Sequence, residues 1–141
     1  MTTMMKHLAA ALVVAVAASG CGGPTDPSRN QTETFSGAVQ PLGVEYKPFN
    51  IANLGEISIT LASLTPGNVV LGVGYGQPAG TGCGLIQSNA VSNTNVGRTV
   101  LTGQILIKGA YCLAVFDPSG VLLNIAPWTV AQNYSVTVSH P

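Results

Sequence analysis

The chain has 141 residues, of which 46% are hydrophobic and only 7% are charged, with five positive charges balancing five negative ones. This length predicts a single domain, and the scarcity of Lys and Arg excludes a nucleic-acid binder, which needs clustered positive charge to neutralise phosphates. The low charge also excludes a coiled coil or helix bundle, whose exposed faces are rich in Glu and Lys.

The first 20 residues have the arrangement of an export signal. Lys6 and His7 precede an uninterrupted apolar run at 8–18, which is too short to span a bilayer stably. The small residues Ser19 and Gly20 follow the run, and Cys21 comes directly after them. We therefore expect residues 1–20 to be a signal peptide that is removed from the exported protein.

This segment resembles the signal peptide of bacterial lipoproteins, in which the cysteine of a lipobox is acylated and becomes the mature N-terminus. The resemblance places the lipid on Cys21 and implies an envelope protein held to a membrane by acyl chains. Ala18 stands where that family usually has Leu, and Gly22 rather than Asp follows the cysteine, which in the enterobacterial sorting rule points to the outer membrane. The alternative is an ordinary secretory signal, cleaved near Ala18 or Gly20.

Cys83 and Cys112 are the two cysteines that remain once Cys21 carries a lipid. An oxidising envelope favours a disulfide between them, which would stabilise the fold by about 3–4 kcal/mol in the chain-entropy model. Two free thiols or a shared metal are the alternatives, and two cysteines without a nearby His make a poor metal site.

The rest of the chain predicts a tether followed by one all-β domain. Residues 21–33 are Gly, Pro and polar residues without hydrophobic periodicity, which is typical of a flexible linker. From 34 to 141, period-two alternation recurs between turn signals and predicts an antiparallel β-sandwich of about eight short strands. The expected strands lie at 35–39, 44–51, 57–61, 69–75, 83–86, 98–107, 111–116 and 134–139, with a further short one at 121–125.

Three local features refine this prediction. Pro48 places the strand at 44–51 at an edge or bulge, because proline cannot donate a ladder hydrogen bond. The alternate glycines between 72 and 76 indicate close packing or a bulge rather than a phosphate loop, since no strand–turn–helix context follows. Residues 117–120 fit a type I turn that begins at Asp117.

Residues 34–141 resemble the bacterial pre-peptidase C-terminal domain family. The segments that carry the resemblance are 35–37, 46–49, 57–61, 109–115 and 134–138. The resemblance implies a jelly-roll-like β-sandwich that is non-catalytic and aids secretion, solubility or substrate binding. Some members hold calcium with clustered acidic residues, and this chain has no such cluster.

The chemistry-bearing residues are too scattered to predict an active site, a metal site or a cofactor. His140 is the only His that remains in the mature chain, and we interpret it as a solvated residue near the chain end. Glu45 and Glu56 are the only acidic pair on neighbouring strands, and we interpret both as solvent-facing residues that discourage edge pairing. No enzymatic activity is expected.

Candidate binding residues are one aromatic side chain and one loop. Trp128 would stack on a sugar if it were exposed, or it covers one end of the sandwich. Asn89, Asn93 and Asn95, in a polar loop predicted at 88–97, would hydrogen-bond a polar ligand or serve left-handed turns. We expect a lipid-anchored, non-catalytic envelope protein that acts as a structural or protein-interaction module; a carbohydrate-binding module at the cell surface is the alternative.

Overall fold

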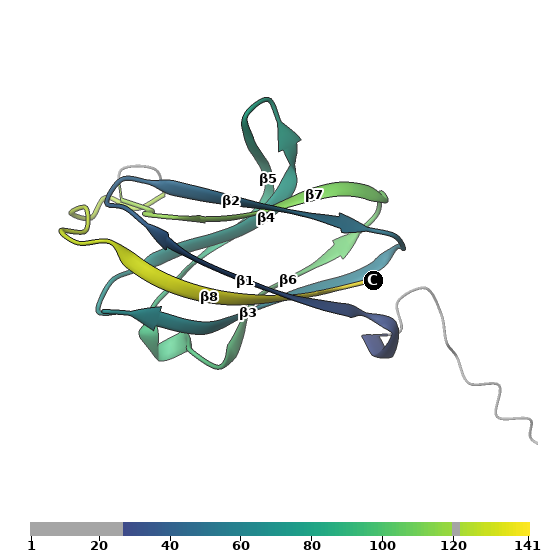
Figure 1. The fold of residues 1–141 in the computed structure, drawn as a ribbon, viewed down its shortest axis with the longest axis horizontal. Helices are drawn as coiled ribbons and strands as arrows, with labels where there is room; N and C mark the ends of the chain where they lie inside the picture. The colour runs from purple at the N-terminus through teal and green to yellow at the C-terminus, as the bar shows by residue number, and fades with distance from the viewer. Residues whose placement is uncertain (1–26, 120–121) are drawn as a thin grey trace, which may run out of the picture.

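Two four-stranded antiparallel sheets pack face to face in the computed structural model, which describes residues 27–119 and 122–141 (Figure 1). One sheet has the order β1-β8-β3-β6 and the other β2-β7-β4-β5. This strand order is that of a jelly roll, and the chain crosses from one sheet to the other at every connection except that between β4 and β5. The predicted all-β sandwich is confirmed. The predicted signal peptide at 1–20, Cys21 and residues 22–26 of the predicted tether lie outside the described residues.

Eight strands and two short 3-10 helices make up the regular structure of the described chain. Their bounds are η1 Pro27–Arg29, β1 Gln31–Val39, β2 Val44–Ile51, β3 Gly55–Thr65, β4 Leu71–Ala79, β5 Gly82–Val91, η2 Asn93–Asn95, β6 Arg98–Ile105, β7 Gly109–Phe116 and β8 Gln132–His140. Within the described ranges, no helix has the length and apolar character needed to cross a membrane.

The structure corrects three of the predicted boundaries. β1 begins at Gln31, inside the predicted tether, because the strand pairs with β8 along its whole length. β5 continues to Val91, so Asn89 lies in a strand and not in the loop predicted at 88–97. In the described part of 121–125 there is no strand, because the N–H groups of Leu122 and Leu123 both donate to the carbonyl of Pro118 and form a turn.

The inward faces of the two sheets form one apolar core. Alternation in β3 buries Ile57, Ile59 and Leu61, as the sequence predicts, and alternation in β8 buries Val136 and Val138. Each such side chain contributes about 1.5–3 kcal/mol when it is removed from water. The outward face of the same sheet carries hydroxyl pairs between neighbouring strands. These pairs are Thr34 with Thr137, Ser36 with Ser135, and Thr60 with Thr99.

In the second sheet, one edge is formed by β2, and the neighbouring strand β7 is covered on both of its faces. β2 is the edge strand, which confirms the position predicted from Pro48. In β7, residues 111, 113 and 115 join the core, whereas Cys112, Ala114 and Phe116 lie on the opposite face and are nevertheless buried. That face is covered by the β4–β5 hairpin, which bends at a bulge between Tyr75 and Gly76.

The predicted disulfide is present and fastens this hairpin. Cys83 near the hairpin tip is bonded to Cys112 of β7, with the two Cα atoms 5.9 Å apart. The glycines of β4 provide the space, as their spacing predicts: a Cβ on Gly72 would overlap the ring of Phe116, and one on Gly76 would overlap the backbone of Gly84. The hairpin therefore projects from the outward face of the sheet in a fixed position (Figure 1).

Candidate functional site

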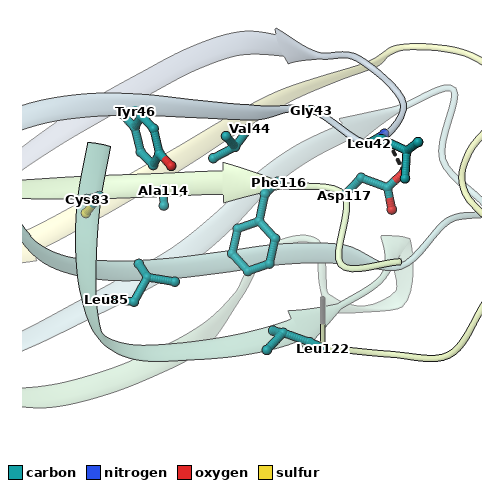
Figure 2. A pocket seen from close by; sticks show the side chains of 10 residues that line it. All are labelled: Leu42, Gly43, Val44, Tyr46, Cys83, Leu85, Ala114, Phe116, Asp117 and Leu122. Carbon is teal, nitrogen blue, oxygen red and sulfur yellow. Dashed lines mark hydrogen bonds between the residues drawn. The ribbon is translucent and has the colours of Figure 1, made fainter. Parts of the chain in front are cut away.

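An apolar pocket opens where the hairpin meets the outward face of the sheet (Figure 2). Its volume is about 220 Å³. The side chains around it come from the β1–β2 turn, β2, β5, β7 and the segment after β7. The lining residues are Leu42, Gly43, Val44, Tyr46, Cys83, Leu85, Ala114, Phe116, Asp117 and Leu122.

The floor of the pocket is buried, and its rim is exposed. Ala114 and Phe116 form the floor, and the Phe116 ring is held against Gly72 of the neighbouring strand. The rim consists of apolar side chains that are between 42% and 68% exposed. These residues are Leu42, Val44, Tyr46, Leu85 and Leu122. Exposed apolar side chains that gather in one place are a feature of interaction sites when the patch is large.

Asp117 is the charged residue of the pocket lining, and its carboxylate is fully used within the chain. Oδ2 accepts hydrogen bonds from the backbone N–H groups of Leu42, at 3.0 Å, and Trp128, at 3.2 Å. Oδ1 accepts from the backbone N–H of Ser119, at 3.0 Å, and from its hydroxyl, at 2.6 Å. Burial acts to raise the pKa of Asp117, but these four hydrogen bonds outweigh burial and lower the pKa below its ordinary value.

Trp128 lies beside a second, more open depression of about 330 Å³, which Asn68 and Thr129 also line. Its side chain is only 7% exposed, and its indole N–H donates to the backbone carbonyl of Val70 at 3.1 Å. Of the two roles considered for Trp128, this burial favours the covering role, because a sugar needs an open ring face.

The three asparagines use their side chains for contacts within the chain. Asn89 donates to the carbonyl of Val100 at 2.8 Å, and Asn95 accepts from the backbone N–H of Ser92 at 2.9 Å. Asn93 donates to the side chain of Asn68 at 3.4 Å, which places Asn93 beside the Trp128 depression. Neither Asn89 nor Asn95 lines that depression, so the structure does not assemble the four predicted residues into one site.

The interpretation of His140 as a solvated residue is wrong. His140 is completely buried, its ring lies 5.3 Å from that of Phe49, and its Nε2 is 2.9 Å from Oε1 of Glu33. The cause is the early start of β1, because Gln31 pairs with His140 and continues the sheet to the end of β8. A position near the chain end indicates exposure, and the sequence pattern does not reveal the partner strand.

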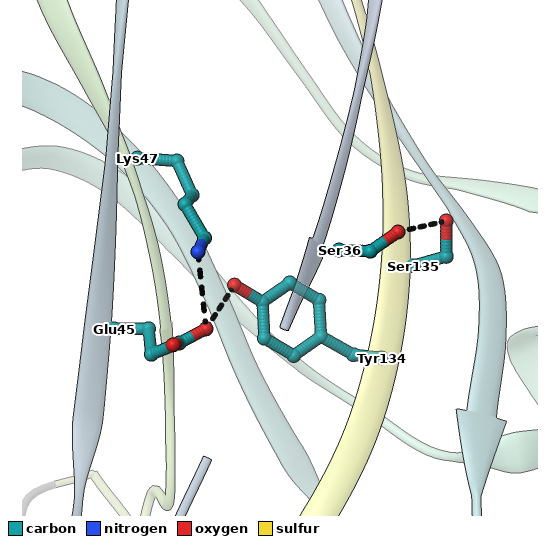
Figure 3. Close-up of polar contacts among 5 residues, drawn as sticks. All are labelled: Ser36, Glu45, Lys47, Tyr134 and Ser135. Atoms are coloured by element: carbon teal, nitrogen blue, oxygen red, sulfur yellow. Dashed lines mark hydrogen bonds and ion pairs between the residues drawn. The ribbon is translucent and has the colours of Figure 1, made fainter. Parts of the chain in front are cut away.

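Glu45 is also more engaged than predicted. Its Oε2 accepts a hydrogen bond from the Tyr134 hydroxyl at 2.6 Å and lies 3.6 Å from Nζ of Lys47 (Figure 3). Burial raises the pKa of Tyr134, and the hydrogen bond and negative charge of Glu45 raise it further. Glu45 on β2 therefore links the two sheets, while Glu56 lies on β3 of the other sheet.

Sequence comparison gives no match for this chain, either to a family model or to a curated protein. Comparison of structures does give matches. The mitogen YPM from Yersinia pseudotuberculosis is 17% identical, with a TM-score of 0.54 over 79% of this chain and 87% of that one. PliG from Aeromonas hydrophila, a periplasmic inhibitor of g-type lysozyme, is 11% identical, with a TM-score of 0.51 over 79% and 88%. At these identities, the likeness shows the shared β-sandwich fold alone.

Proposed function

We propose that this chain is a lipid-anchored, non-catalytic protein of the bacterial envelope that acts as a protein-interaction module. The observation that carries the proposal is the apolar pocket with its exposed apolar rim, on a domain that carries few charged residues. Buried apolar anchors in such pockets supply most of the binding energy of protein interfaces. The lipobox resemblance at Cys21 supports the anchoring, and the jelly-roll strand order agrees with the family resemblance of residues 34–141.

The size and charge of the pocket favour an apolar side chain of a partner protein as the occupant. Its volume of about 220 Å³ lies below the ~300–1,000 Å³ of sites that enclose free small ligands, whereas a cavity of about 150 Å³ holds one benzene ring. The carboxylate of Asp117 already accepts four hydrogen bonds, so a charged occupant would lose water without gaining a partner. One uncharged aromatic or branched aliphatic side chain fits the volume of the pocket and needs no charged partner in it.

A non-catalytic role is supported by the way the chain uses its ionisable side chains. Asp117 organises turns, Glu45 connects the two sheets, and His140 packs against Phe49 with Glu33 as its partner. The fold is one that an exported binding protein such as the Aeromonas hydrophila inhibitor uses, although that likeness assigns no partner to this chain.

Two measurements test the proposal. The first is the intact mass of the protein extracted from native membranes, where we expect a diacyl or triacyl adduct on Cys21. An unmodified N-terminus on a soluble protein would contradict the anchoring. The second is an NMR titration of the full chain carrying Cys21→Ala, purified without detergent, with N-acetyl-phenylalanine amide as the probe. We expect shifts confined to the pocket and a dissociation constant on the order of 1–10 mM.

The chain offers a matched pair of variants for this titration. Leu85 lines the pocket and Ile86, the next residue, does not, although the two side chains are 43% and 57% exposed. Leu85→Lys should weaken binding of the probe at least tenfold, and Ile86→Lys should change it less than twofold. Equal effects of the two substitutions on binding of the probe would count against a protein partner at this site. Tighter binding of decanoate, a fatty acid, than of the probe would also count against it.

Carbohydrate binding is the second candidate function, and one observation favours it: Trp128 lines an open depression together with polar residues. Because Trp128 is the only Trp of the chain, a change in fluorescence on addition of soluble glucan or peptidoglycan fragments reports directly on this site. An unchanged emission spectrum, as expected for the buried ring, would remove the candidate.

A further inference from the structure

Two loops lie side by side at one end of the sandwich. The β2–β3 loop spans 52–54, and the β6–β7 loop spans 106–108. The residues that flank the loops are paired in the sheets, Ile51 with Gly109 and Gly55 with Ile105, so the two loops connect the same ends of the two sheets.

These two loops expose apolar side chains where turns normally carry polar ones. Leu106 is 78% exposed, which makes it the most exposed large hydrophobic residue of the described chain, and the next residue, Ile107, is 61% exposed. Leu54 on the neighbouring loop is 40% exposed. The β6–β7 loop is held in place, because the Tyr111 hydroxyl donates to the backbone carbonyl of Ile107 at 2.8 Å. We call these three residues, Leu54, Leu106 and Ile107, the apolar tip.

The chain enters the sandwich at the same end. β1 begins at Gln31, which pairs with His140, and the side chain of Asn30 donates to the backbone carbonyl of Glu56, next to the start of β3. Figure 1 shows this entry at the right, where the C-terminus also lies. The segment from Cys21 to Gln31 spans at most about 35 Å even when fully extended, so an acylated Cys21 keeps this end of the domain near the bilayer.

We propose that the apolar tip inserts into the lipid bilayer that holds Cys21. This inference rests on the proposed lipid anchor and adds an orientation to it. A bilayer is the occupant that the geometry favours, because the tether keeps the tip within about 35 Å of the membrane surface, and because acyl chains are themselves apolar. Lys108, directly after the tip, keeps its ammonium group in the headgroup layer while its alkyl stem lies along apolar surface.

Tip insertion fixes which way the pocket faces. β1 has nine residues and spans about 30 Å before the β1–β2 turn, where Leu42 forms part of the pocket rim. The pocket therefore lies toward the end of the sandwich that is farther from the membrane, where a soluble or surface partner has access to it.

The test uses the full lipidated chain in vesicles of phosphatidylethanolamine and phosphatidylglycerol, with brominated acyl chains that quench nearby Trp emission. Ile107→Trp places a reporter on the tip. Val130→Trp is the matched control, because Val130 is 53% exposed and lies close before β8, whose first residue pairs with the end of β1. We expect the vesicles to quench the emission that Ile107→Trp adds at least twofold. The emission that Val130→Trp adds should fall by less than a tenth. Adding Leu106→Ser to the Ile107→Trp variant should reduce the quenching of its reporter at least twofold.

The outcomes separate this inference from the proposed function. An acyl adduct on Cys21 without quenching at position 107 would leave the anchor intact and overturn tip insertion. Equal quenching at positions 107 and 130 would also overturn it, because the domain would then have no preferred orientation. If Cys21 carries no lipid, the proposed anchor is wrong. Tip insertion is then tested by adding vesicles to the unlipidated Ile107→Trp chain: quenching supports it, and no quenching overturns it.

Discussion

At the scale of single residues, Asp117 connects segments that are far apart in the sequence. Its carboxylate joins the β1–β2 turn through Leu42, the end of β7 through Ser119, and the segment before β8 through Trp128. Each partner is a donor that would otherwise be buried or half-buried without an acceptor. Leaving such donors unpaired costs about 1–3 kcal/mol for each group, so the carboxylate stabilises more than one turn.

Asp117→Asn should therefore destabilise the fold by about 2–3 kcal/mol at neutral pH, because an amide has one acceptor oxygen in place of two. Urea unfolding measures this loss. The fold lowers the pKa of Asp117 below its ordinary value of 3.8, so the stabilisation is present above that pH and disappears as the pH falls below it. The difference between the two proteins should shrink accordingly in acid.

Ser119→Ala is the control for this substitution. It removes one hydrogen bond and keeps both the charge and the two long-range contacts, so we expect a loss of about 1 kcal/mol. An Asp117→Asn variant with the stability of the parent at pH 7 would show that the carboxylate network contributes nothing.

Sequence patterns predict residue roles well when the partner is local and poorly when it is distant. The turn at Asp117 is predicted from residues 117–120, and the structure shows a local bond of the kind such turns form, from the backbone N–H of Ser119 to the Asp117 carboxylate. The bonds to Leu42 and Trp128 span 75 and 11 residues, and nothing in the local sequence encodes them. His140 fails for the same reason, because its burial depends on pairing with Gln31 at the other end of the domain.

At the scale of elements, alternation predicts the strands whose two faces differ. β3 and β8 alternate between core and hydroxyl-bearing faces, and this pattern locates both in the sequence. β7 is buried on both faces, and packing between the two sheets explains only the burial of its inward-facing side chains. The outward set, Cys112, Ala114 and Phe116, is covered by a hairpin that the sequence indicates only through alternate glycines and a cysteine pair. The pocket itself could not be predicted, because it arises from this bend.

The disulfide should matter most for that hairpin. Replacing Cys83 and Cys112 together with Ala should lower the free energy of unfolding by about 2–4 kcal/mol. Hydrogen exchange should accelerate more for amides at 82–85 than for those of β3, because the hairpin tip has lost its attachment to β7 while β3 keeps both neighbouring strands. NMR exchange rates measure both regions in one experiment.

Reduction of the unsubstituted chain is the matched control and should reproduce the pattern without any change of sequence. The same acceleration in β3 and at the hairpin tip would mean that the bond stabilises the whole domain and not the hairpin in particular.

At the scale of the whole molecule, the two exposed apolar surfaces lie toward opposite ends of the sandwich. The apolar tip lies where the chain enters the domain, and the pocket lies beyond the bend of the β4–β5 hairpin, near the β1–β2 turn. The outward face of the first sheet, on the other side of the sandwich from the pocket, carries paired hydroxyl groups that hydrogen-bond one another. Such a molecule suits an arrangement in which one end rests on a membrane and the other end meets a partner.

The charge balance of the molecule predicts how tip insertion responds to salt. At the end that carries the apolar tip, the positive charges of Arg29 and Lys108 are opposed by the negative charges of Glu33 and Glu56, so attraction to anionic headgroups nearly cancels. Raising NaCl from about 50 mM to about 500 mM shortens the range of charge interactions severalfold but leaves apolar transfer intact or slightly strengthened. The quenching of Ile107→Trp in anionic vesicles should therefore change by less than about a fifth. Loss of quenching in high salt would assign the membrane contact to charge and not to the apolar tip.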